Sequence, residues 1–523
     1  MSYVFHDYET FNLSPLGGAP SQYAAIRTSK DFAIQSTENF FCLASEDTMP
    51  EIHACLVTKQ TPNSIKSSGN ALVEYDFVRK IHNILLEQPK TVVVGYNSLR
   101  FDDEWNRHLF YRNLFPAYDW HFKNGNSRYD AILLMQATYA LRPHLLNWHY
   151  VPVKEGSDQM RVSMKLEDIA KVNGITHENA HDALSDVYAL ISLMQKIKEA
   201  DPEFFETALQ VNNKHHVSAM LQKNDNQNGL LYISPFESEH NFVGYVIPLF
   251  PSSTDNNVFW AWDAKVNPES ILSLDDEVKS KLLSLKKDDL EALNLSKKGL
   301  VKISLNKLPN LFEKEVYKRE FAADGSLNEL RQTISDNIYS VKSCLTKIKE
   351  LVALVESSAP TYADRTDADM GLYSSGFMSK SESSFVTQFA KLNNWQSRYD
   401  LIRNEAPTNR ISKLGMRIVG RNSPEILDKA DKELWDLYLN SRFIGAVDNT
   451  PVIDGFPMSS ISQVEFLEKY IANVMPDSVD FQITTELIEY YKTKTPSEEF
   501  IAILSENLTD SLQLLDDLGS DLF

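Results

Sequence analysis

The stretch FHDYETF, residues 5–11, places two acidic side chains in an apolar segment that predicts an early β-strand. In a strand alternate side chains share a face, so Asp7 and Glu9 project together, away from Tyr8. Two neighbouring carboxylates repel each other and raise each other's pKa unless a cation lies between them. The motif therefore indicates either a cation site or an ordinary polar strand edge.

A second acidic motif follows the next candidate strand, in the stretch VVVGYNSLRFDDEW, residues 92–105. The apolar run ends at Gly95, where the chain can turn, and Asp102 opens a segment with helical spacing of apolar residues. An acid at a helix start also interacts favourably with the helix dipole. Asp102 is therefore either a functional carboxylate or a helix cap.

The third motif is NAHDALSDVYALISLM, residues 179–194. His181 lies five residues before Asp186, on the approach to a predicted helix. This spacing lets an imidazole from the preceding loop and a carboxylate from the helix converge on one cleft. Asp182 lies between them, and helix capping alone explains it.

Apolar runs alternate with helical stretches over about the first 195 residues, which predicts an α/β layer built on a central sheet. The expected strands are Tyr3–Thr10, Ala24–Thr28, Phe40–Leu43 and Thr91–Tyr96. The expected helices are Val73–Leu86, Phe101–Leu114, Asp130–Tyr139, Lys165–Val172 and Asp182–Ile197.

The pattern changes to short β-rich pieces after about residue 213. These pieces are Leu230–Ser234, Phe242–Leu249, Val258–Asp263 and Leu300–Leu305, and a helical insertion is expected at Asp275–Leu295. Ser357–Ser384 has the composition of a linker or long loop, and Phe385–Leu515 has helical periodicity. We therefore predict three domains, at residues 1–198, 199–355 and 356–523.

The net charge of −20 argues against a protein that coats nucleic acid indiscriminately, because phosphate contacts need Lys and Arg. A local basic channel remains compatible with that charge.

The three cysteines, Cys42, Cys55 and Cys344, lack the close spacing of zinc ligands or a disulfide framework. The longest apolar segment is about half of what a membrane crossing needs, so we expect a cytoplasmic protein with no membrane partner.

The order and separation of the three motifs resemble the DEDDh exonucleases, a family with a ribonuclease-H-like α/β fold. The resemblance implies that two Mg²⁺ ions, for which Mn²⁺ can substitute, bind the four carboxylates and that a histidine is the general base. The residues so implied are Asp7, Glu9, Asp102 and Asp186 for the metal and His181 for the base.

Further segments look like the bacterial exodeoxyribonuclease I family in particular. They are SQYAAIRT (21–28), NSRYDAILLMQATYALRP (126–143), HENAHDALSDVYA (177–189), LYSSGF (372–377) and RISKLGMRIVGRN (410–422). The likeness implies an exonuclease domain followed by a small Src-homology-3-like β-barrel and an all-α C-terminal domain. It also implies 3′→5′ degradation of single-stranded DNA to 5′-mononucleotides, in DNA repair and recombination.

The same resemblance assigns four residues to substrate binding: Glu9, Thr10, Arg128 and Lys165. Thr10 is expected beside the terminal nucleotide, and Arg128 and Lys165 are expected to border the path of the strand. Relatives can carry arginine where this chain has Lys165.

Two side-chain sets allow a second interpretation besides DNA binding. The basic residues Arg410, Lys413, Arg417 and Arg421 form one stripe on a helix, which is either a row along a phosphate backbone or an ordinary solvated face. The aromatic residues Tyr23, Tyr129 and Tyr373 are either base-stacking platforms or core residues.

Relatives bind the C-terminal peptide of single-stranded DNA-binding protein in a basic pocket. Arg142 matches one element of that pocket, whereas Thr207 stands where relatives can offer an aromatic side chain. The chain's own end, SDLF with Phe523 last, loosely resembles a sliding-clamp-binding peptide, although Gly519 replaces the usual glutamine. A disordered tail is the alternative for this end. We expect a monomer.

Two other functions compete with this hypothesis. A DEDDh nuclease that acts on RNA oligomers, or that proofreads for a polymerase, usually stands alone or beside a polymerase, so the further 300 or so residues disfavour it. An inactive DNA-binding scaffold needs none of the five catalytic residues, and all five are present.

Overall fold

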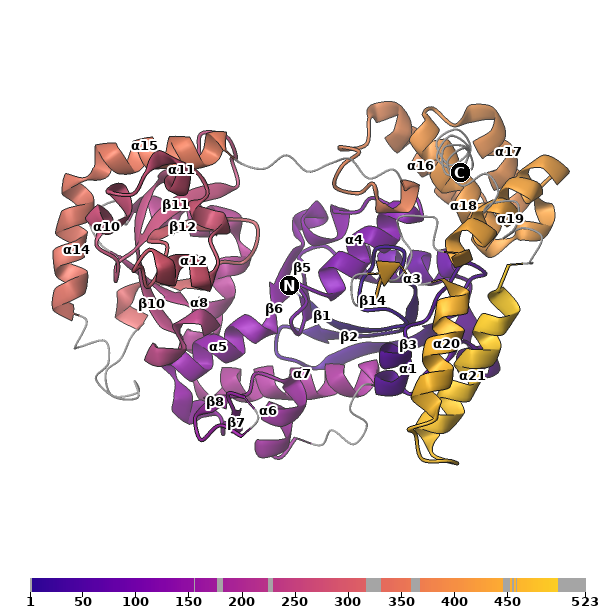
Figure 1. Ribbon diagram of the computed structural model, residues 1–523, viewed down its shortest axis with the longest axis horizontal. Helices are drawn as coiled ribbons and strands as arrows, with labels where there is room; N and C mark the ends of the chain where they lie inside the picture. The colour runs from indigo at the N-terminus through magenta and orange to yellow at the C-terminus, as the bar shows by residue number, and fades with distance from the viewer. Residues whose placement is uncertain are drawn as a thin grey trace.

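The computed structural model describes residues 2–154, 156–175, 182–223, 229–316, 331–358, 367–444, 452–453, 456–457 and 459–496. A six-stranded mixed sheet forms the centre of the N-terminal part (Figure 1). Its strands are β1 (Ser2–Thr10), β2 (Pro20–Ser29), β3 (Ile34–Cys42), β4 (Ala71–Leu72), β5 (Thr91–Gly95) and β6 (Ser127–Asp130). In the order β4-β3-β2-β1-β5-β6, β1 is antiparallel to β2 and parallel to β5, so it lies inside the sheet.

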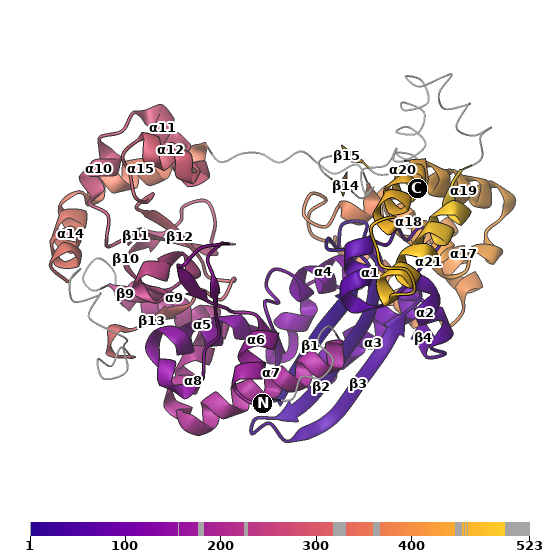
Figure 2. The same ribbon diagram turned by 60° about the horizontal axis from the view of Figure 1, so that its bottom comes forward.

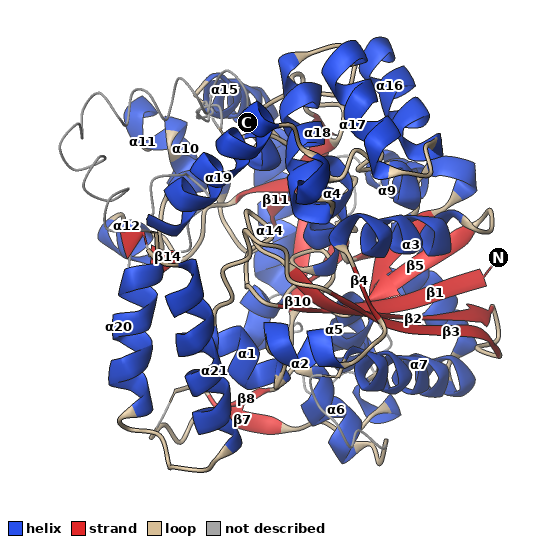
Figure 3. Ribbon diagram, turned by 90° about the vertical axis from the view of Figure 1, so that its right-hand side faces the viewer, coloured by secondary structure: helices blue, strands red, loops and turns tan. Residues whose placement is uncertain are grey.

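Helices cover both faces of this sheet, and Figure 3 shows α3 and α7 on opposite sides of it. The helices of this part are α1 (Ile52–Thr58), α2 (Pro62–Ser67), α3 (Glu74–Leu86), α4 (Asp102–Arg112), α5 (Ala131–Leu141), α6 (Leu166–Val172), α7 (Ala183–Ala200), α8 (Pro202–Leu209) and α9 (Lys214–Lys223). The predicted strands and helices of this part are all present. The elements α1, α2, α8, α9, β4 and β6 are not among the predicted ones, and most of them are too short to show a clear period.

A five-stranded antiparallel sheet follows, in the order β12-β11-β10-β9-β13. Its strands are β9 (Leu230–Ile233), β10 (Val243–Pro251), β11 (Val258–Asp263), β12 (Leu300–Ser304) and β13 (Leu311–Phe312). The predicted helical insertion contains α11 (Asp276–Ser280) and α12 (Lys287–Ala292), and α10 (Pro268–Leu272) precedes it. Two longer helices, α14 (Arg331–Ser343) and α15 (Leu345–Ser357), were not predicted and bury apolar residues against this sheet.

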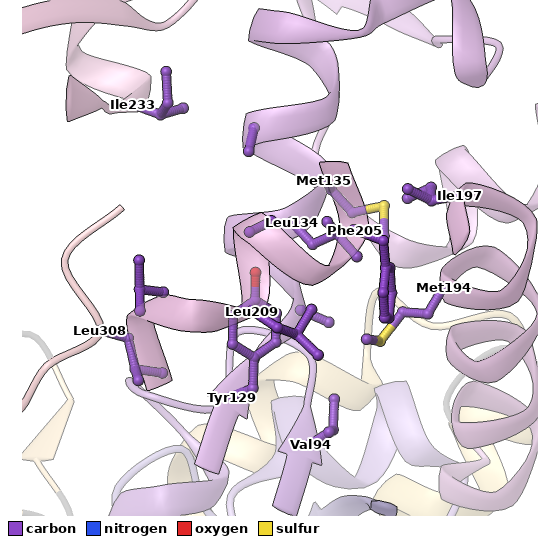
Figure 4. Packing of buried hydrophobic residues seen from close by; sticks show 14 of the residues in the cluster. Val94, Tyr129, Leu134, Met135, Met194, Ile197, Phe205, Leu209, Ile233 and Leu308 are labelled. Carbon is purple, nitrogen blue, oxygen red and sulfur yellow. The ribbon is translucent and has the colours of Figure 1, made fainter. Parts of the chain in front are cut away.

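One hydrophobic core joins this small barrel to the first domain. Val94 of β5, Met194 of α7 and Phe205 of α8 belong to the same buried cluster as Ile233 and Leu308 of the barrel. Figure 4 shows these residues together with Tyr129, Leu134 and Leu209. The barrel therefore packs against the α5, α7 and α8 side of the central sheet through continuous apolar contacts.

The C-terminal part is helical, as the periodicity predicts. Its main elements are α16 (Lys380–Lys391), α17 (Trp395–Glu405), α18 (Asn409–Asn422), α19 (Lys429–Ile444), α20 (Ser460–Ile471) and α21 (Val479–Lys494). Apolar residues of α16, α17, α18 and α19 share a core with α3, α4 and the sheet. The views in Figures 1 and 2 place α20 and α21 beside α1, and apolar residues of these three helices form a further cluster. No helix of the described ranges is long and apolar enough to cross a membrane.

The basic stripe on α18 is largely buried, so both interpretations of it as an exposed face are wrong. Arg417 Nη1 lies 2.8 Å from Asp367 Oδ2 and 2.9 Å from Asp369 Oδ2. Arg421 binds Asp369 and also reaches Asp47, 2.9 Å from Nε to Oδ2. We call these five residues the buried ion cluster. Helical spacing predicts that side chains share a face, but it does not predict what that face packs against.

The other two basic residues of the stripe also point to protein partners or to the interior. Arg410 binds Glu382, the residue that completes the capping box of α16. Lys413 is buried. The predicted linker Ser357–Ser384 instead contains a short 3-10 helix, Ala368–Met370, and the start of α16. Residues 367–372 are packed into the domain, because Asp367, Asp369 and Leu372 are buried.

The buried ion cluster predicts a large stability loss on Asp369→Ala. Burial alone raises the pKa of Asp369, but Arg421 and Arg417 outweigh burial and hold that pKa well below its usual range. Removal of the carboxylate leaves two buried guanidinium groups short of a partner, at a cost of about 3–5 kcal/mol. Urea unfolding followed by tryptophan fluorescence measures this loss.

Asp480→Ala is the matched control, because Asp480 pairs with Lys59 and both side chains are about half exposed. We expect a change below about 1 kcal/mol for that exposed pair. Equal losses in the two variants would show that the cluster does not stabilise the fold.

Candidate active site

The centre of the site is a group of three carboxylates. Asp7 and Glu9 project from one face of β1, and Asp186 lies in the first turn of α7. One carboxylate oxygen from each of the three lies within 4.8 Å of the others. The structure therefore brings together three of the four acids that the sequence motifs predict as metal ligands.

The carboxylates strongly disfavour one another's ionisation. Burial first, and then the carboxylates of Asp186 and Asp102, raise the pKa of Glu9 to about 9. Burial, followed by Asp102 and Asp186, also raises the pKa of Asp7 well above its usual range. A divalent cation between these oxygens would reverse both effects, because it favours the ionised form.

Asp102, the fourth acid, lies beside the group at the first residue of α4. The N-cap position belongs to Phe101, and no side chain caps this end of the helix. The Asp102 carboxylate accepts a hydrogen bond from the backbone N–H of Tyr8, 3.2 Å from N to Oδ1. Burial, and then Asp103, raises its pKa well above the usual range. The side chain is therefore turned toward β1, and the helix-cap interpretation is wrong.

Asp182 is a helix cap, as the alternative interpretation predicts. It is the N-cap of α7, and its carboxylate accepts hydrogen bonds from Ser185 N at 3.2 Å and from Gln22 Nε2 at 2.8 Å. This cap fixes the start of the helix that carries Asp186. His181 lies outside the described residues.

The predicted substrate residues differ in their surroundings. The Thr10 hydroxyl donates to the backbone carbonyl of Asn12 at 2.6 Å, directly after the strand that holds Glu9. The Lys165 side chain is 74% exposed, and its ammonium lies 3.3 Å from Glu167. Arg128 is buried, where it binds Asp103 and donates to the carbonyl of Asn306 at 2.9 Å. Arg128 therefore connects the first domain to the barrel.

The predicted partner-binding residue Arg142 is also buried. Its guanidinium donates to Asp201 at 3.0 Å and to the carbonyl of Val316 at 3.0 Å, and it lies over the ring of Phe204. Thr207 is on α8, where its hydroxyl donates to the carbonyl of Glu203. Phe523 and the SDLF end lie outside the described residues.

We give the name aromatic rim to Tyr118, Phe122, Tyr373 and Phe377. The ring of His121 contacts those of Tyr118 and Phe122, and Tyr373 lies on the same short loop as Phe377. Phe377 is 89% exposed, and Tyr373 and Phe122 are each 59% exposed. The rings of Tyr118 and Phe377 lie 6.0 Å apart. The other two aromatic residues considered as base platforms, Tyr23 and Tyr129, are core residues.

The aromatic rim adjoins α4, the helix that begins with Asp102. The hydroxyl of Tyr373 donates to Glu104 Oε2 at 2.6 Å, and Arg107 binds the same carboxylate. Sequence reasoning included only Tyr373 of the four. The LYSSGF motif carries both Tyr373 and Phe377 and is the sequence signal for this pair, but it lies within a segment of linker-like composition.

Family models match most of the chain in three consecutive pieces. The model described as Exonuclease matches residues 4–194, Exonuclease I SH3-like domain matches residues 212–351, and Exonuclease I C-terminal domain matches residues 366–493. The central sheet, the small barrel and the helical part thus each have a family counterpart. A DEDDh domain that stands alone does not explain the second and third matches.

Curated relatives agree with this assignment. Exodeoxyribonuclease I of Escherichia coli is 32% identical over 447 residues, which cover 83% of this chain and 88% of the relative. Exodeoxyribonuclease I of Haemophilus influenzae is 34% identical over 388 residues, which cover 73% of this chain and 78% of the relative.

Solved structures extend the likeness to the whole fold. E. coli Exonuclease I in complex with a dA16 oligonucleotide matches with a TM-score of 0.82 and 27% identity, over 94% of this chain and 100% of that one. A zinc-bound E. coli ExoI–ssDNA complex gives 0.80 and 28%, over 94% and 99%. An ExoI/SSB-Ct complex gives 0.79 and 27%, over 95% and 99%. The chain belongs to the bacterial exodeoxyribonuclease I family and is a hydrolytic nuclease.

Proposed function

We propose that this chain removes nucleotides one at a time from the 3′ end of single-stranded DNA and releases 5′-mononucleotides. The observation that supports it most is the carboxylate group Asp7, Glu9 and Asp186 inside a fold that relatives named Exodeoxyribonuclease I share. The proposed domains, residues 1–198, 199–355 and 356–523, assign hydrolysis to the first. We further propose a cytoplasmic monomer that acts in DNA repair and recombination.

Two Mg²⁺ ions are the proposed cofactor, and Mn²⁺ can substitute for them. The residues present fit such ions, because hard divalent cations prefer carboxylate oxygens and usually keep water and phosphate oxygens as well. Asp7, Glu9 and Asp186 would hold them, together with Asp102 beside the group. When bound, such ions supply positive charge to the phosphate and lower the pKa of water.

The protein's own groups then orient the reactants and move one proton. His181 is the proposed general base, since an imidazole with an ordinary pKa near 6.5 accepts a proton from water at neutral pH. Asp102 is fixed against the backbone of β1 by the N–H of Tyr8, which keeps its carboxylate next to Asp7. Glu9 and Thr10 lie at the end of β1, where we propose that they contact the terminal nucleotide.

We propose that the DNA strand leaves the site along Lys165, Arg128 and the aromatic rim. The exposed ammonium of Lys165 suits a phosphate. Arg128 would border the DNA strand at the junction between the first domain and the barrel. Its hydrogen bonds to Asp103 and to the carbonyl of Asn306 connect the two domains there. Exposed aromatic rings such as Phe377 stack on bases of any sequence.

The proposed protein partners are the C-terminal peptide of single-stranded DNA-binding protein and, through Phe523, a sliding clamp. The likeness to an ExoI/SSB-Ct complex supports the first. Because Arg142 is buried with Asp201 and Phe204, we propose that it supports the peptide pocket from inside the protein. The SDLF sequence supports the second.

Loss of any one acid should nearly abolish turnover without unfolding the protein. We expect this result for alanine at Asp7, Glu9, Asp102 or Asp186, whereas His181→Ala should lower the rate and spare metal binding. Digestion of a 5′-labelled single strand, with Mg²⁺ or chelator and beside matched duplex and RNA, measures activity.

Asp182→Ala is the control for Asp186→Ala, because it removes a carboxylate four residues away on the same helix end. A lost cap costs about 1 kcal/mol of stability, and most of the turnover should remain. Full activity after Asp186→Ala, or a ladder that persists in chelator, would contradict the proposed metal site.

Metal binding should become stronger as the pH rises. Glu9 has its pKa raised to about 9, above the ordinary value of 4.5, so the metal-free fold loses stability as the pH rises from 4.5 through 9. A bound cation removes this loss of stability, because it binds the ionised form of Glu9. For each proton that the cation displaces, the apparent affinity for the metal rises about tenfold per pH unit. The increase in melting temperature on addition of Mn²⁺ should therefore be larger at pH 8.5 than at pH 6.

The Glu9→Gln variant tests the origin of this pH effect, because it has no proton to release at that position. Its Mn²⁺-induced increase in melting temperature should depend less on pH. An unchanged pH dependence in Glu9→Gln would show that Glu9 does not contribute.

Phe377→Ala should weaken binding of long single strands. A base–aromatic stack contributes about 1–3 kcal/mol, which corresponds to roughly 5- to 150-fold in affinity. Fluorescence anisotropy with a labelled 30-nucleotide strand in chelator measures binding without hydrolysis. Phe236→Ala is the control, because Phe236 is 84% exposed and lies between β9 and β10 of the barrel domain. Equal effects of the two variants would refute the rim as part of the DNA path.

A further inference from the structure

The loop between β1 and β2, residues 11–19, begins directly after Glu9 and Thr10. It is closed on itself, because Phe11 N donates to Ala19 O at 2.9 Å and Ala19 N donates to Asn12 Oδ1 at 3.0 Å. The Thr10 hydroxyl donates to Asn12 O at 2.6 Å. A shift of this loop is therefore transmitted to the strand end that carries Glu9.

A second segment, residues 44–51 after β3, supports the 11–19 loop from outside. The backbone N–H of Glu51 donates to Phe11 O at 2.8 Å, and the Asn12 amide donates to Met49 O at 2.8 Å. Both bonds connect the loop to the backbone of this second segment. The position of the loop thus depends on what holds residues 44–51.

Helices α19 and α21 of the C-terminal part hold both segments. The guanidinium of Arg442 donates to Asp47 O at 2.6 Å through Nε and to Gly17 O through Nη2. Arg442 is only 1% exposed, although it is among the largest side chains of the chain. The hydroxyl of Tyr490 donates to Thr48 O at 2.8 Å, and that of Tyr491 donates to Pro50 O at 2.7 Å.

The neighbouring residue Gly18 leaves the loop little space to move. A Cβ at this position would lie 2.2 Å from Ser14 O and 3.0 Å from the Trp105 ring. The carbonyl of Gly18 accepts from Arg112 Nη1 at 2.6 Å, and Arg112 is itself paired with buried Glu74. Two buried arginines, Arg112 and Arg442, therefore fix adjacent carbonyls of the same loop.

We infer that Arg442 is a positioning residue for hydrolysis, through which the C-terminal helices keep the Glu9–Thr10 strand end in register. The inference rests on the proposed function. Its physical basis is that a small misplacement of a catalytic group by a distant change lowers the rate up to about a hundredfold. Arg442 touches neither Glu9 nor Asp7 in any described contact, so its effect passes through the 11–19 loop and residues 44–51.

If Arg442 positions the Glu9–Thr10 strand end, the rate of the chemical step depends on Arg442 even for a DNA that is too short to reach the C-terminal helices. The test compares wild type, Arg442→Lys and Tyr491→Phe on a 5′-labelled thymidine tetranucleotide and on a 30-nucleotide strand, with kcat and KM measured separately. Arg442→Lys keeps the charge and loses the two-pronged guanidinium. Tyr491→Phe removes only the hydroxyl that donates to Pro50 O. This second variant tests the inference if Arg442→Lys does not fold.

We expect Arg442→Lys to lower kcat about ten- to a hundredfold on both substrates, with KM for the long strand within about twofold. Tyr491→Phe should lower kcat several-fold in the same manner. Arg403→Lys is the matched control on the same domain, since Arg403 pairs with Asp431 and has no contact with residues 11–19 or 44–51 among the contacts of the described ranges. Its kcat should equal that of wild type.

An unchanged kcat in both Arg442→Lys and Tyr491→Phe would overturn the inference, and so would a rise in KM for the long strand alone. The latter result would show that the C-terminal helices only bind DNA. If wild type cleaves the long strand but not the tetranucleotide, the inference is judged by kcat of the two variants on the long strand, relative to wild type. If wild type cleaves neither strand with Mg²⁺ or Mn²⁺, the proposed function fails instead.

Discussion

Electrostatic repulsion among closely spaced carboxylates is the constraint around which this fold is organised. Asp7, Glu9 and Asp186 converge within a few ångströms, and burial together with repulsion from neighbouring carboxylates raises the pKa of both Asp7 and Glu9. The strand that carries two of them lies inside the sheet, and β2 pairs with it at both Asp7 and Glu9. That placement prevents the acids from separating. The fold thus maintains a group of acids that hold protons at neutral pH and that a divalent cation can bind by displacing those protons.

The two faces of the central sheet serve two different domains. The core on the α5, α7 and α8 side continues into the barrel, whereas the core on the α3 and α4 side continues into the C-terminal helices. Buried ion pairs accompany these apolar contacts, with Arg128 at the first junction and Arg421 at the second. Several arginines, among them Arg128, Arg417 and Arg421, are therefore used inside the protein and are not free to bind phosphate.

The acid pair of β1 could be predicted from the sequence because its geometry is local. A period of two places Asp7 and Glu9 on one face of any strand, and the Asp182 cap and the start of α7 follow from short-range rules. The burial of the basic stripe on α18 could not be predicted in this way. Arg421 meets Asp47 across 374 residues of sequence, so no local pattern distinguishes its burial from exposure.

The same limit explains the other misjudged segments. Residues 367–372 have the composition of a linker, but their two aspartates are the partners of Arg417. The exposure of Phe377 also depends on tertiary packing, which composition does not encode. Sequence patterns thus identified the chemistry of the site, whereas the surfaces around it required the arrangement of the domains.

The continuity of the cores has a consequence for how such a chain changes over evolution. A barrel whose apolar residues complete the interior of its neighbour cannot be exchanged for a foreign module without exposing rings such as Phe204, which stacks on Phe312 of the barrel. The same holds for the helices that cover α3 and α4. Inheritance should therefore act on all three parts as one unit, with variation confined to outward-facing loops.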